Sequence, residues 1–445
     1  MQQDTVEYRD KECVYIVKVL SDFLNLPCEV KVGERYCITG KNGKLEINNV
    51  FWGILGNEYL KKENIPAELK WLNTPFEGLR QVPIIYGVDE LVIENNDVYC
   101  GLDIFSSAFF MLTRWEELFL PKDKFGRCDE NEMFVVKHGI YNRPVVNEYI
   151  ELLRKLLVYI GVEVKKCDRE FHPFITHDVD DLFRYASYKN FCKNLAGDIL
   201  HRKSLKTFLR TCYNYVRYRG GKVKDPFDTF DEMMDLSDQY GYKNAFYFMP
   251  SYRKEYDIRY DIRDKKVKTI IAHIIERGHE VGVHPSKNTF LCAEWFRKEM
   301  LRLNKVCPKV KGGRQHYLLY SIPETLRTWE DNGLAYDAGL GFAFRGGFRC
   351  GICYDYPFFD VLERRQLDLW IHPLIVMETA LLRDGKNKEV IREDIFGLVD
   401  TVRKYRGEFV FLWHTDNFNR VEYYKYRELY FQTLKYMAHG GMENS

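Results

Sequence analysis

The sequence lacks any long apolar run. Its best candidate, 104–112, contains two serines and is followed by Arg114. A helix that crosses a bilayer needs about 18 to 20 consecutive apolar residues, so we expect no membrane span. The N-terminal residues Met1 to Glu7 also lack the basic stretch and apolar run of a secretory signal. We therefore expect a cytoplasmic protein.

The sequence also has no excess of positive or negative side chains. The chain has 66 Lys and Arg against 65 Asp and Glu, which gives no drive toward phosphate backbones or anionic lipid. Nucleic acid is thus not an expected partner. The 12 cysteines are scattered, and the one close pair, Cys350 and Cys353, lacks a second pair at zinc-ribbon spacing. This pattern favours reduced thiols over disulfides or a structural zinc.

With 445 residues, 46% of them hydrophobic, the chain predicts two globular domains. Residues 1–165 mix helical periodicity (14–24, 105–118) with short strand-like runs (83–86, 90–93), which indicates a smaller accessory α/β domain. We place the boundary at the charged string 163–169. A second domain then spans 170–440.

The second domain predicts strands that alternate with helices, the pattern of parallel βα units. The expected strands are 171–176, 245–249, 280–283, 310–314, 334–336, 369–371 and 409–413. Seven βα units over about 270 residues favour a (β/α)7 barrel over an open sheet. We expect helices in the insertion 177–243. We also expect a helix after Ser321 with a capping box formed by Ser321 and Glu324.

Chemically active side chains follow several of these strands. Catalytic groups of such barrels gather at the C-terminal strand ends, so these positions are the candidates. The segments are Thr176 to Asp181, His284 to Asn288, Arg314 to Tyr317 and His414 to Asp416, with Asp337 and His372 after the fifth and sixth strands. Singly, such an Asp is more often a turn former and such a His a satisfied surface residue. Four segments with such side chains at the same end of the predicted barrel favour an active site over four unrelated turns.

These segments carry a resemblance to the polysaccharide deacetylase family, also called the NodB-homology or carbohydrate esterase family 4 enzymes. Thr176-His177-Asp178-Val179-Asp180 resembles the family's T-F-D-x-D motif, with His for Phe. His284 to Asn288 resembles H-[ST]-x-x-H with Asn in the last place. Arg314 to Tyr317 resembles R-x-P-[YW] with His for Pro, and Phe411 to His414 resembles the last motif, an apolar strand that ends in His.

The resemblance implies roles for these residues. Asp178 would be the general base, oriented by Arg314, and His414 would protonate the leaving amine. Asp180, His284 and Asn288 would hold a divalent metal, with zinc the expected ion. Tyr317 and His316 would contribute to substrate binding, Tyr317 through its backbone N–H. From their positions at strand ends, His372 and Asp337 are also candidates for substrate binding. For Asp337 the residues favour a turn, and for His372 packing is equally expected.

Asn288 is the main departure from the family pattern. A neutral amide oxygen binds zinc less well than imidazole, which predicts weaker binding, another metal or none. His177 or His316 could supply the missing ligand instead. The sequence does not say where either ring points.

The expected function is hydrolysis of a non-peptide carbon–nitrogen bond, the de-N-acetylation of an N-acetylated sugar or oligosaccharide in surface polysaccharide biosynthesis. With no signal sequence, a nucleotide-linked or lipid-linked sugar fits better than extracellular polymer. One alternative is a catalytically silent carbohydrate-binding barrel, which Asn288 and His316 motivate. Another is a metal-independent hydrolase of cyclic amides.

The front domain carries a second resemblance. Its segments Asp103 to Ser106, Leu112 to Glu117 and Pro144 to Asn147 resemble an accessory region that precedes such deacetylase domains in bacterial surface-polysaccharide gene clusters. From the residues alone, we expect Arg114 and Glu116 to lie on a solvated helix surface.

Overall fold

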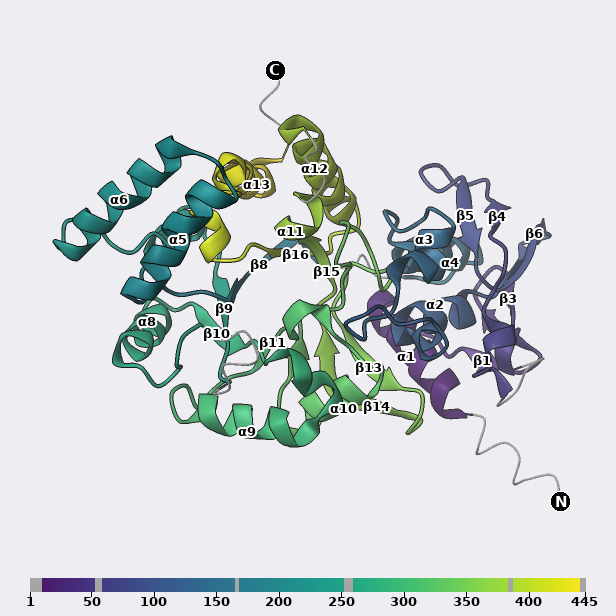
Figure 1. Ribbon diagram of the computed structural model, residues 1–445. Coiled ribbons are helices and arrows are strands. Elements are labelled where there is room, and N and C mark those ends of the chain that lie inside the picture. The colour runs from purple at the N-terminus through teal and green to yellow at the C-terminus, as the bar shows by residue number, and fades with distance from the viewer. Residues whose placement is uncertain (1–9, 53–57, 165–167, 252–258, 383–386, 441–445) are drawn as a thin grey trace. The chain divides into compact units, whose positions relative to one another are not determined.

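The computed structural model describes residues 10–52, 58–164, 168–251, 259–382 and 387–440 (Figure 1). The chain forms two compact units, each built from several segments. The first contains 1–172, 317–376 and 397–410, and the second contains 173–316, 377–396 and 411–445. Neither unit is one continuous stretch, and the predicted boundary between residues 165 and 170 stays a prediction.

A five-stranded sheet opens the first unit. Its strands are β1 (Lys31–Val32), β2 (Arg35–Thr39), β3 (Lys44–Asn48), β6 (Gly87–Glu94) and β7 (Asp97–Leu102), in the order β1-β2-β3-β7-β6. The pairs are antiparallel except β3 with β7, which is parallel. Buried and exposed residues alternate along β2 and β3, so one face of the sheet contacts the core. A hairpin of β4 (Lys70–Asn73) and β5 (Gln81–Ile84) forms a separate sheet.

Helix α2 (Ile104–Thr113) occupies the centre of this core, because all ten of its residues are buried. Asp103 caps it, accepting a hydrogen bond from the backbone N–H of Ser106 at 2.9 Å. The other helices of this part are α1 (Asp10–Leu24), α3 (Phe134–Lys137) and α4 (Val145–Tyr159). The apolar run 104–112 is therefore a core helix.

A buried network of ion pairs follows α2. Arg114, in the left-handed region with φ 53°, pairs with Glu116 at 2.6 Å and with Glu117 at 3.0 Å. Arg349 binds the other oxygen of Glu117 at 2.6 Å. All four side chains are buried. The expectation that Arg114 and Glu116 lie on a solvated surface is wrong, because each charge finds its partners inside the fold.

The first unit also contains three strands from the second half of the chain. Strand β14 (Arg365–Ile371) lies between β12 (Tyr336–Asp337), which is parallel to it, and β13 (Tyr356–Asp360), which is antiparallel. Helix α10 (Glu324–Asp331) begins after Pro323 without a side-chain cap. The predicted capping box is wrong here, because the Ser321 hydroxyl donates to the Glu324 carboxylate and accepts no backbone N–H of the helix.

A parallel sheet forms the centre of the second unit. Strands β8 (His172–Val179), β9 (Asn244–Phe248), β10 (Glu280–Val283) and β11 (Gly312–Gly313) lie in the order β11-β10-β9-β8, and every pair is parallel. The end of β16 (Glu408–Leu412) runs beside β8, where Trp413 N–H donates to Thr176 O at 3.1 Å. Each of the seven predicted strand segments overlaps a strand, and the mixed α/β class is confirmed. Closure into a barrel stays a prediction.

The helices of the second unit alternate with these strands. They are α5 (Tyr188–Leu200), α6 (Leu205–Arg219), α7 (Phe230–Gln239), α8 (Lys265–Glu276), α9 (Ala293–Asn304), α11 (Glu378–Leu381) and α13 (Arg427–His439). Three of them, α5 to α7, lie in the insertion between the first two predicted strands, which is helical as expected. Helix α12 (Lys388–Lys404) and strand β15 (Leu374–Met377) each contribute residues to both units. Over the described ranges, no helix is long and apolar enough to cross a membrane.

The ion-pair network of the first unit yields a stability prediction. Glu117→Gln leaves two buried guanidinium groups without their shared carboxylate, and removing one member of a buried ion pair costs about 3 to 5 kcal/mol. The measurement is the free energy of unfolding in urea, taken from the first unfolding transition of the variant and of the unaltered protein. Arg35→Gln is the control, because its pair with Glu46 is 48% and 26% exposed and such pairs contribute about 0 to 1 kcal/mol. Equal losses in the two variants would contradict a structural role for the network.

Candidate functional site

Asp178 and Arg314 form a buried ion pair at the C-terminal edge of the parallel sheet. Arg314 Nη1 donates to Asp178 Oδ1 at 2.8 Å, and its Nη2 donates to the Thr176 hydroxyl at 2.8 Å. Gly313 makes this geometry possible, because a Cβ there would lie 1.9 Å from Val283 O. Burial raises the pKa of Asp178, but His284, Arg314 and His414 together lower it below its usual range. Asp178 is therefore ionised, with one carboxylate oxygen already bound.

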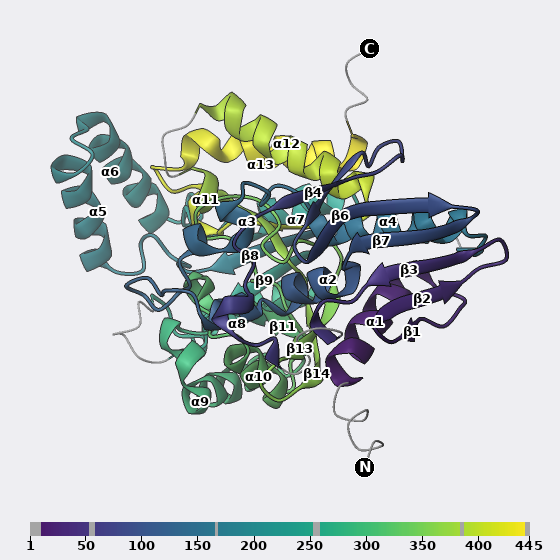
Figure 2. The same cartoon turned by 90° about the vertical axis from the view of Figure 1, so that its right-hand side faces the viewer.

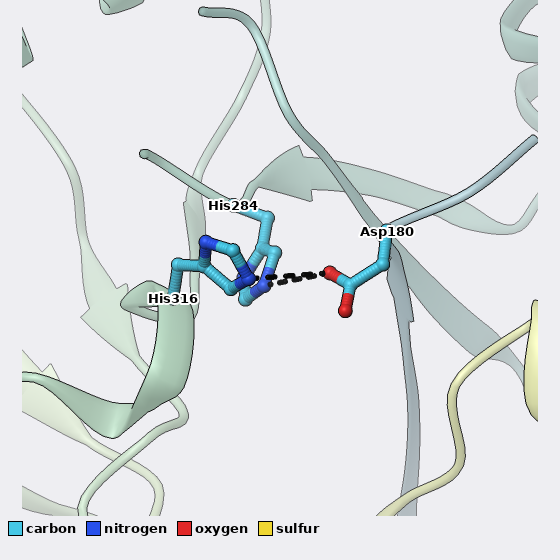
Figure 3. A group of neighbouring side chains, drawn as sticks. All are labelled: Asp180, His284 and His316. Atoms are coloured by element: carbon cyan, nitrogen blue, oxygen red, sulfur yellow. Dashed lines mark ion pairs between the residues drawn. The ribbon is translucent and has the colours of Figure 1, made fainter. Parts of the chain in front are cut away.

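Three side chains beside this pair converge on one point (Figure 3). They are Asp180, His284 and His316, whose ligand atoms all lie within 4.8 Å of one another. Asp180 Oδ1 is 3.4 Å from His284 Nε2 and 3.7 Å from His316 Nε2. The two imidazole rings meet edge to face with centroids 4.7 Å apart. This group could hold a divalent cation.

The donor atoms of the group suit a metal. Asp180 Oδ1 and His284 Nε2 are both buried, and neither makes a hydrogen bond to the part of the chain that the structure describes. His284 Nδ1 lies 2.7 Å from the carbonyl oxygen of Arg314. A proton on Nδ1 that donates to this carbonyl leaves the Nε2 lone pair pointing at the group, as in metal-bound histidines. One carboxylate and two imidazoles are ligands that zinc and related ions accept.

The pKa shifts agree with this reading. Burial lowers the pKa of His284, but Asp178 and Asp180 raise it above its usual value, so the two carboxylates favour a positive charge at this position. Burial lowers the pKa of His316 to about 4, and this ring is neutral at pH 7 with a lone pair to offer. Burial raises the pKa of Asp180, but His316, His284 and His414 bring it well below the usual range. A metal ligand must be deprotonated, as Asp180 and His316 already are.

His414 completes the group from the strand β16 side. Its Nε2 lies 4.0 Å from Asp178 Oδ2 and 4.0 Å from Asp180 Oδ2, and its Nδ1 contacts Glu378 Oε1 at 2.6 Å. Although burial lowers the pKa of His414, the carboxylate of Glu378 raises it to about 10. A charged imidazolium therefore faces the two aspartates, in a position to donate a proton.

Sequence reasoning missed Glu378. Its side chain is fully buried and also accepts hydrogen bonds from the backbone N–H of His414 at 3.0 Å and from Asn417 at 2.8 Å. The sequence does contain a signal for Glu378, because this residue directly follows the apolar strand β15. Catalytic groups of such barrels stand at the C-terminal ends of strands. That strand was not expected so soon after β14 and Pro373.

His316 and His177, the two alternatives to Asn288 as a metal ligand, lie in different surroundings. His316, predicted for substrate binding, belongs to the candidate metal group. His177 does not, because its ring packs in the core against Phe246 and its Nδ1 lies 2.8 Å from Trp413 O. Burial lowers the pKa of His177 to about 3. Adjacent residues of a strand point to opposite faces, which places His177 and Asp178 on different sides of the sheet.

The remaining predicted residues are not brought into the group. Asn288, on the 3-10 helix η7 (Lys287–Leu291), is half-buried, and no hydrogen bond of its side chain occurs among the described residues. Tyr317, His372 and Asp337 belong to the first unit. His372 Nδ1 contacts Glu408 at 2.6 Å, and Asp337 accepts from Tyr320 and from the backbone N–H of Gly339 in a turn. The roles of these four in metal or substrate binding stay predictions.

The chain is thus an α/β protein with a candidate metal centre of one aspartate and two histidines. Residues 4–161, about a third of the chain, match a model described as a family of unknown function (DUF7033). No curated protein matches the chain. Among solved structures, the chain is similar to a "putative polysaccharide deacetylase from Mycobacterium smegmatis" with 13% identity and a TM-score of 0.38, covering 62% of this chain and 87% of that chain. A likeness of this size does not bear on activity.

The candidate metal group predicts which residues determine metal affinity. His316→Ala should weaken Zn²⁺ binding by more than the roughly 10- to 100-fold typical of losing an outer-shell partner. Asn288→Ala is the matched variant, and we expect a smaller change there. Isothermal titration with Zn²⁺ and the absorption spectrum of the Co²⁺ form measure both. An equal or larger loss in Asn288→Ala would assign the ligand to the amide instead.

Proposed function

We propose that this protein is a hydrolase of an N-acyl bond, and that it removes the acetyl group from an N-acetylated sugar with the help of a divalent metal. The observation that carries the proposal is the convergence of a buried, Arg-bound aspartate, a protonated histidine and a three-residue metal group. Asp178 lies 2.8 Å from Arg314, 3.7 Å from His284 and 4.0 Å from His414. A binding protein has no need of this combination, whereas amide hydrolysis uses every part of it.

Hydrolysis of an amide needs a base that takes a proton from water and an acid that gives one to the leaving nitrogen. Asp178 suits the first role, because Arg314 binds its Oδ1 and keeps it ionised while Oδ2 faces the histidines. His414 suits the second role, because Glu378 keeps it charged and its Nε2 is the proton-bearing nitrogen that faces the site. The products are acetate and the free amine of the sugar.

Asp180, His284 and His316 would hold the cation. A divalent ion bound there would supply Lewis acidity, which polarises the acyl oxygen and lowers the pKa of a bound water. The chain contributes the fixed orientation of the ligands through the contact of His284 with the Arg314 carbonyl. The resemblance of the four sequence motifs to polysaccharide deacetylases supports this reading and gives the acetamido sugar as the substrate class.

The proposal predicts the effect of removing the base. Asp178→Asn should lower kcat for acetate release from N-acetylated glucosamine oligosaccharides by about 10²- to 10⁴-fold, because general base catalysis contributes that much. Zn²⁺ affinity should change far less than in His316→Ala, since Asp178 lies outside the three-residue group. Asp89→Asn, at an exposed position on β6, is the control and should leave the rate unchanged.

Three results would overturn the proposal. Acetate release that is indifferent to a chelator, and is not restored by Zn²⁺, Co²⁺ or Mn²⁺, would remove the metal from the reaction. Ring opening of a cyclic amide without any acetate release from sugars would point to the cyclic amide hydrolases, and binding of oligosaccharides without turnover would point to a carbohydrate-binding protein.

A further inference from the structure

The even charge balance of the whole chain conceals one strongly basic segment. Residues 184–224 contain eleven Lys and Arg and a single acidic residue, Asp198, which gives this segment a net charge of +10 with histidine neutral. The whole chain carries only +1. Asp198 is itself buried and pairs with Arg202 at 2.5 Å. The segment comprises α5, α6 and their flanks, outside the site described above.

A cavity of about 250 Å³ lies at one side of α6 within the second unit. Three basic side chains line it, Arg184 from the segment after β8, Arg210 from α6 and Lys425 from the segment after β16. The amides of Asn214 and Asn419 also line it, and no described residue of the lining is acidic. The cavity thus offers hydrogen-bond donors and positive charge.

Arg184 is the most informative of these residues. It is only 8% exposed, yet its Nε makes no hydrogen bond and its guanidinium forms no ion pair with any residue in the described ranges. The carboxylate of Asp225, after α6, accepts instead from the backbone N–H groups of Arg184 and Tyr185 at 2.8 and 3.0 Å. Burial lowers the pKa of Arg184, and a buried cation that forms no direct ion pair is unfavourable. An anion in the cavity would remove that cost.

We propose that this cavity binds a phosphate group. The planar guanidinium of arginine binds phosphate through two parallel hydrogen bonds, and lysine and amide side chains complete such sites. The volume is below the roughly 300 to 1,000 Å³ of pockets for drug-sized ligands, which suits a phosphate monoester rather than a whole oligosaccharide.

The cavity lies within reach of the candidate metal group. Arg184 follows Asp180 by four residues, so their Cα atoms are at most about 14 Å apart. Asn419 and Lys425 likewise follow His414 on one loop. If the proposed deacetylation holds, the substrate therefore carries phosphate near its N-acetyl sugar, either as a soluble sugar phosphate or as a lipid-linked one. This extension rests on the proposed function, whereas phosphate binding itself does not.

The test is isothermal titration of the full chain, treated with chelator, with inorganic phosphate and with N-acetylglucosamine 1-phosphate. Arg210→Gln and Lys425→Gln, both at exposed positions, should each weaken phosphate binding by about tenfold, the loss of one charge-assisted hydrogen bond. Arg219→Gln, at the exposed end of α6 and outside the cavity, is the control.

Absence of saturable phosphate binding, or an equal loss in Arg219→Gln, would overturn the phosphate site. Because chelator-treated protein is used, this result does not depend on whether the metal group is catalytic. Tighter binding of the sugar phosphate than of inorganic phosphate would favour a soluble substrate, and equal binding would favour a phosphate whose other substituent lies outside the cavity, as in a lipid.

A separate observation concerns the outer face of α6. Its apolar residues Leu205, Leu209, Tyr213 and Val216 are 70%, 58%, 62% and 68% exposed. Their spacing of four, four and three residues places them on one stripe of the helix. In both cartoon views α5 and α6 lie side by side and extend away from the parallel strands of the same unit (Figures 1 and 2). On α5, Tyr188, Ile199 and Leu200 are exposed as well.

An exposed apolar stripe on a basic helix is the pattern of a helix that lies on a membrane surface. Apolar side chains enter the headgroup region, and each nearby Lys or Arg is attracted to anionic lipid. Nucleic acid would account for the basic residues but not for the stripe. We infer that the hairpin α5–α6 docks on an anionic bilayer surface.

Flotation with vesicles tests this inference. The full chain should bind vesicles that contain phosphatidylglycerol and not vesicles of phosphatidylcholine alone. The double variant Leu205→Ser/Leu209→Ser should bind vesicles at least about tenfold more weakly. The reason is that each leucine side chain would be partly buried in the bilayer, and that burial favours binding. Ile275→Ser is the control, because Ile275 is 47% exposed on α8, outside the hairpin.

Three outcomes would overturn the membrane assignment. The first is no vesicle binding by the unaltered chain. The second is a dimer in solution that becomes monomeric in the double variant, which would assign the stripe to a second copy of the chain. The third is single-stranded RNA binding that the double variant retains while vesicle binding is absent.

Discussion

The buried guanidinium of Arg314 is the contact on which the candidate site depends. Its side chain binds Asp178 and Thr176 on β8, its backbone N–H donates to Val283 on β10, and its carbonyl contacts His284. One residue thus fixes the proposed base, the orientation of one candidate metal ligand and the spacing of the strand ends that carry both. Arginine reaches these two oxygens from two separate nitrogens held in one plane, whereas lysine offers a single nitrogen.

The sequence predicted the parallel strands β8, β9 and β10 well, because they are short, mostly apolar runs of eight, five and four residues. Strand β11 consists of only two glycines, Gly312 and Gly313. The sequence also predicted that candidate residues stand at the ends of those strands. Asp178, Asp180, His284, Arg314 and His414 come together in one group, as expected for residues at the C-terminal ends of parallel strands. Their chemical roles rest on the proposal above.

What the sequence could not predict depends on side-chain direction and on tertiary contacts. The direction of the His316 ring toward Asp180 has no signature in spacing. The burial of Arg114 and Glu116 depends on Arg349, which lies far along the chain and contacts the same Glu117. Likewise, a composition averaged over the whole chain hides the basic hairpin, whose charge is offset by acidic residues elsewhere.

The neighbouring places of His284 and His316 bear on how such a centre changes over evolution. The two histidines stand on the loops after adjacent strands, and their side chains approach the same aspartate oxygen from those two loops. In the proposed metal centre, a ligand would therefore pass from one loop to the next without a shift of the bound ion, because the ion depends only on the atoms that surround it. A sequence motif that requires a histidine four residues after His284 would not detect relatives that share this arrangement. A motif that pairs the equivalent of His284 with a histidine two residues after the buried arginine would detect them.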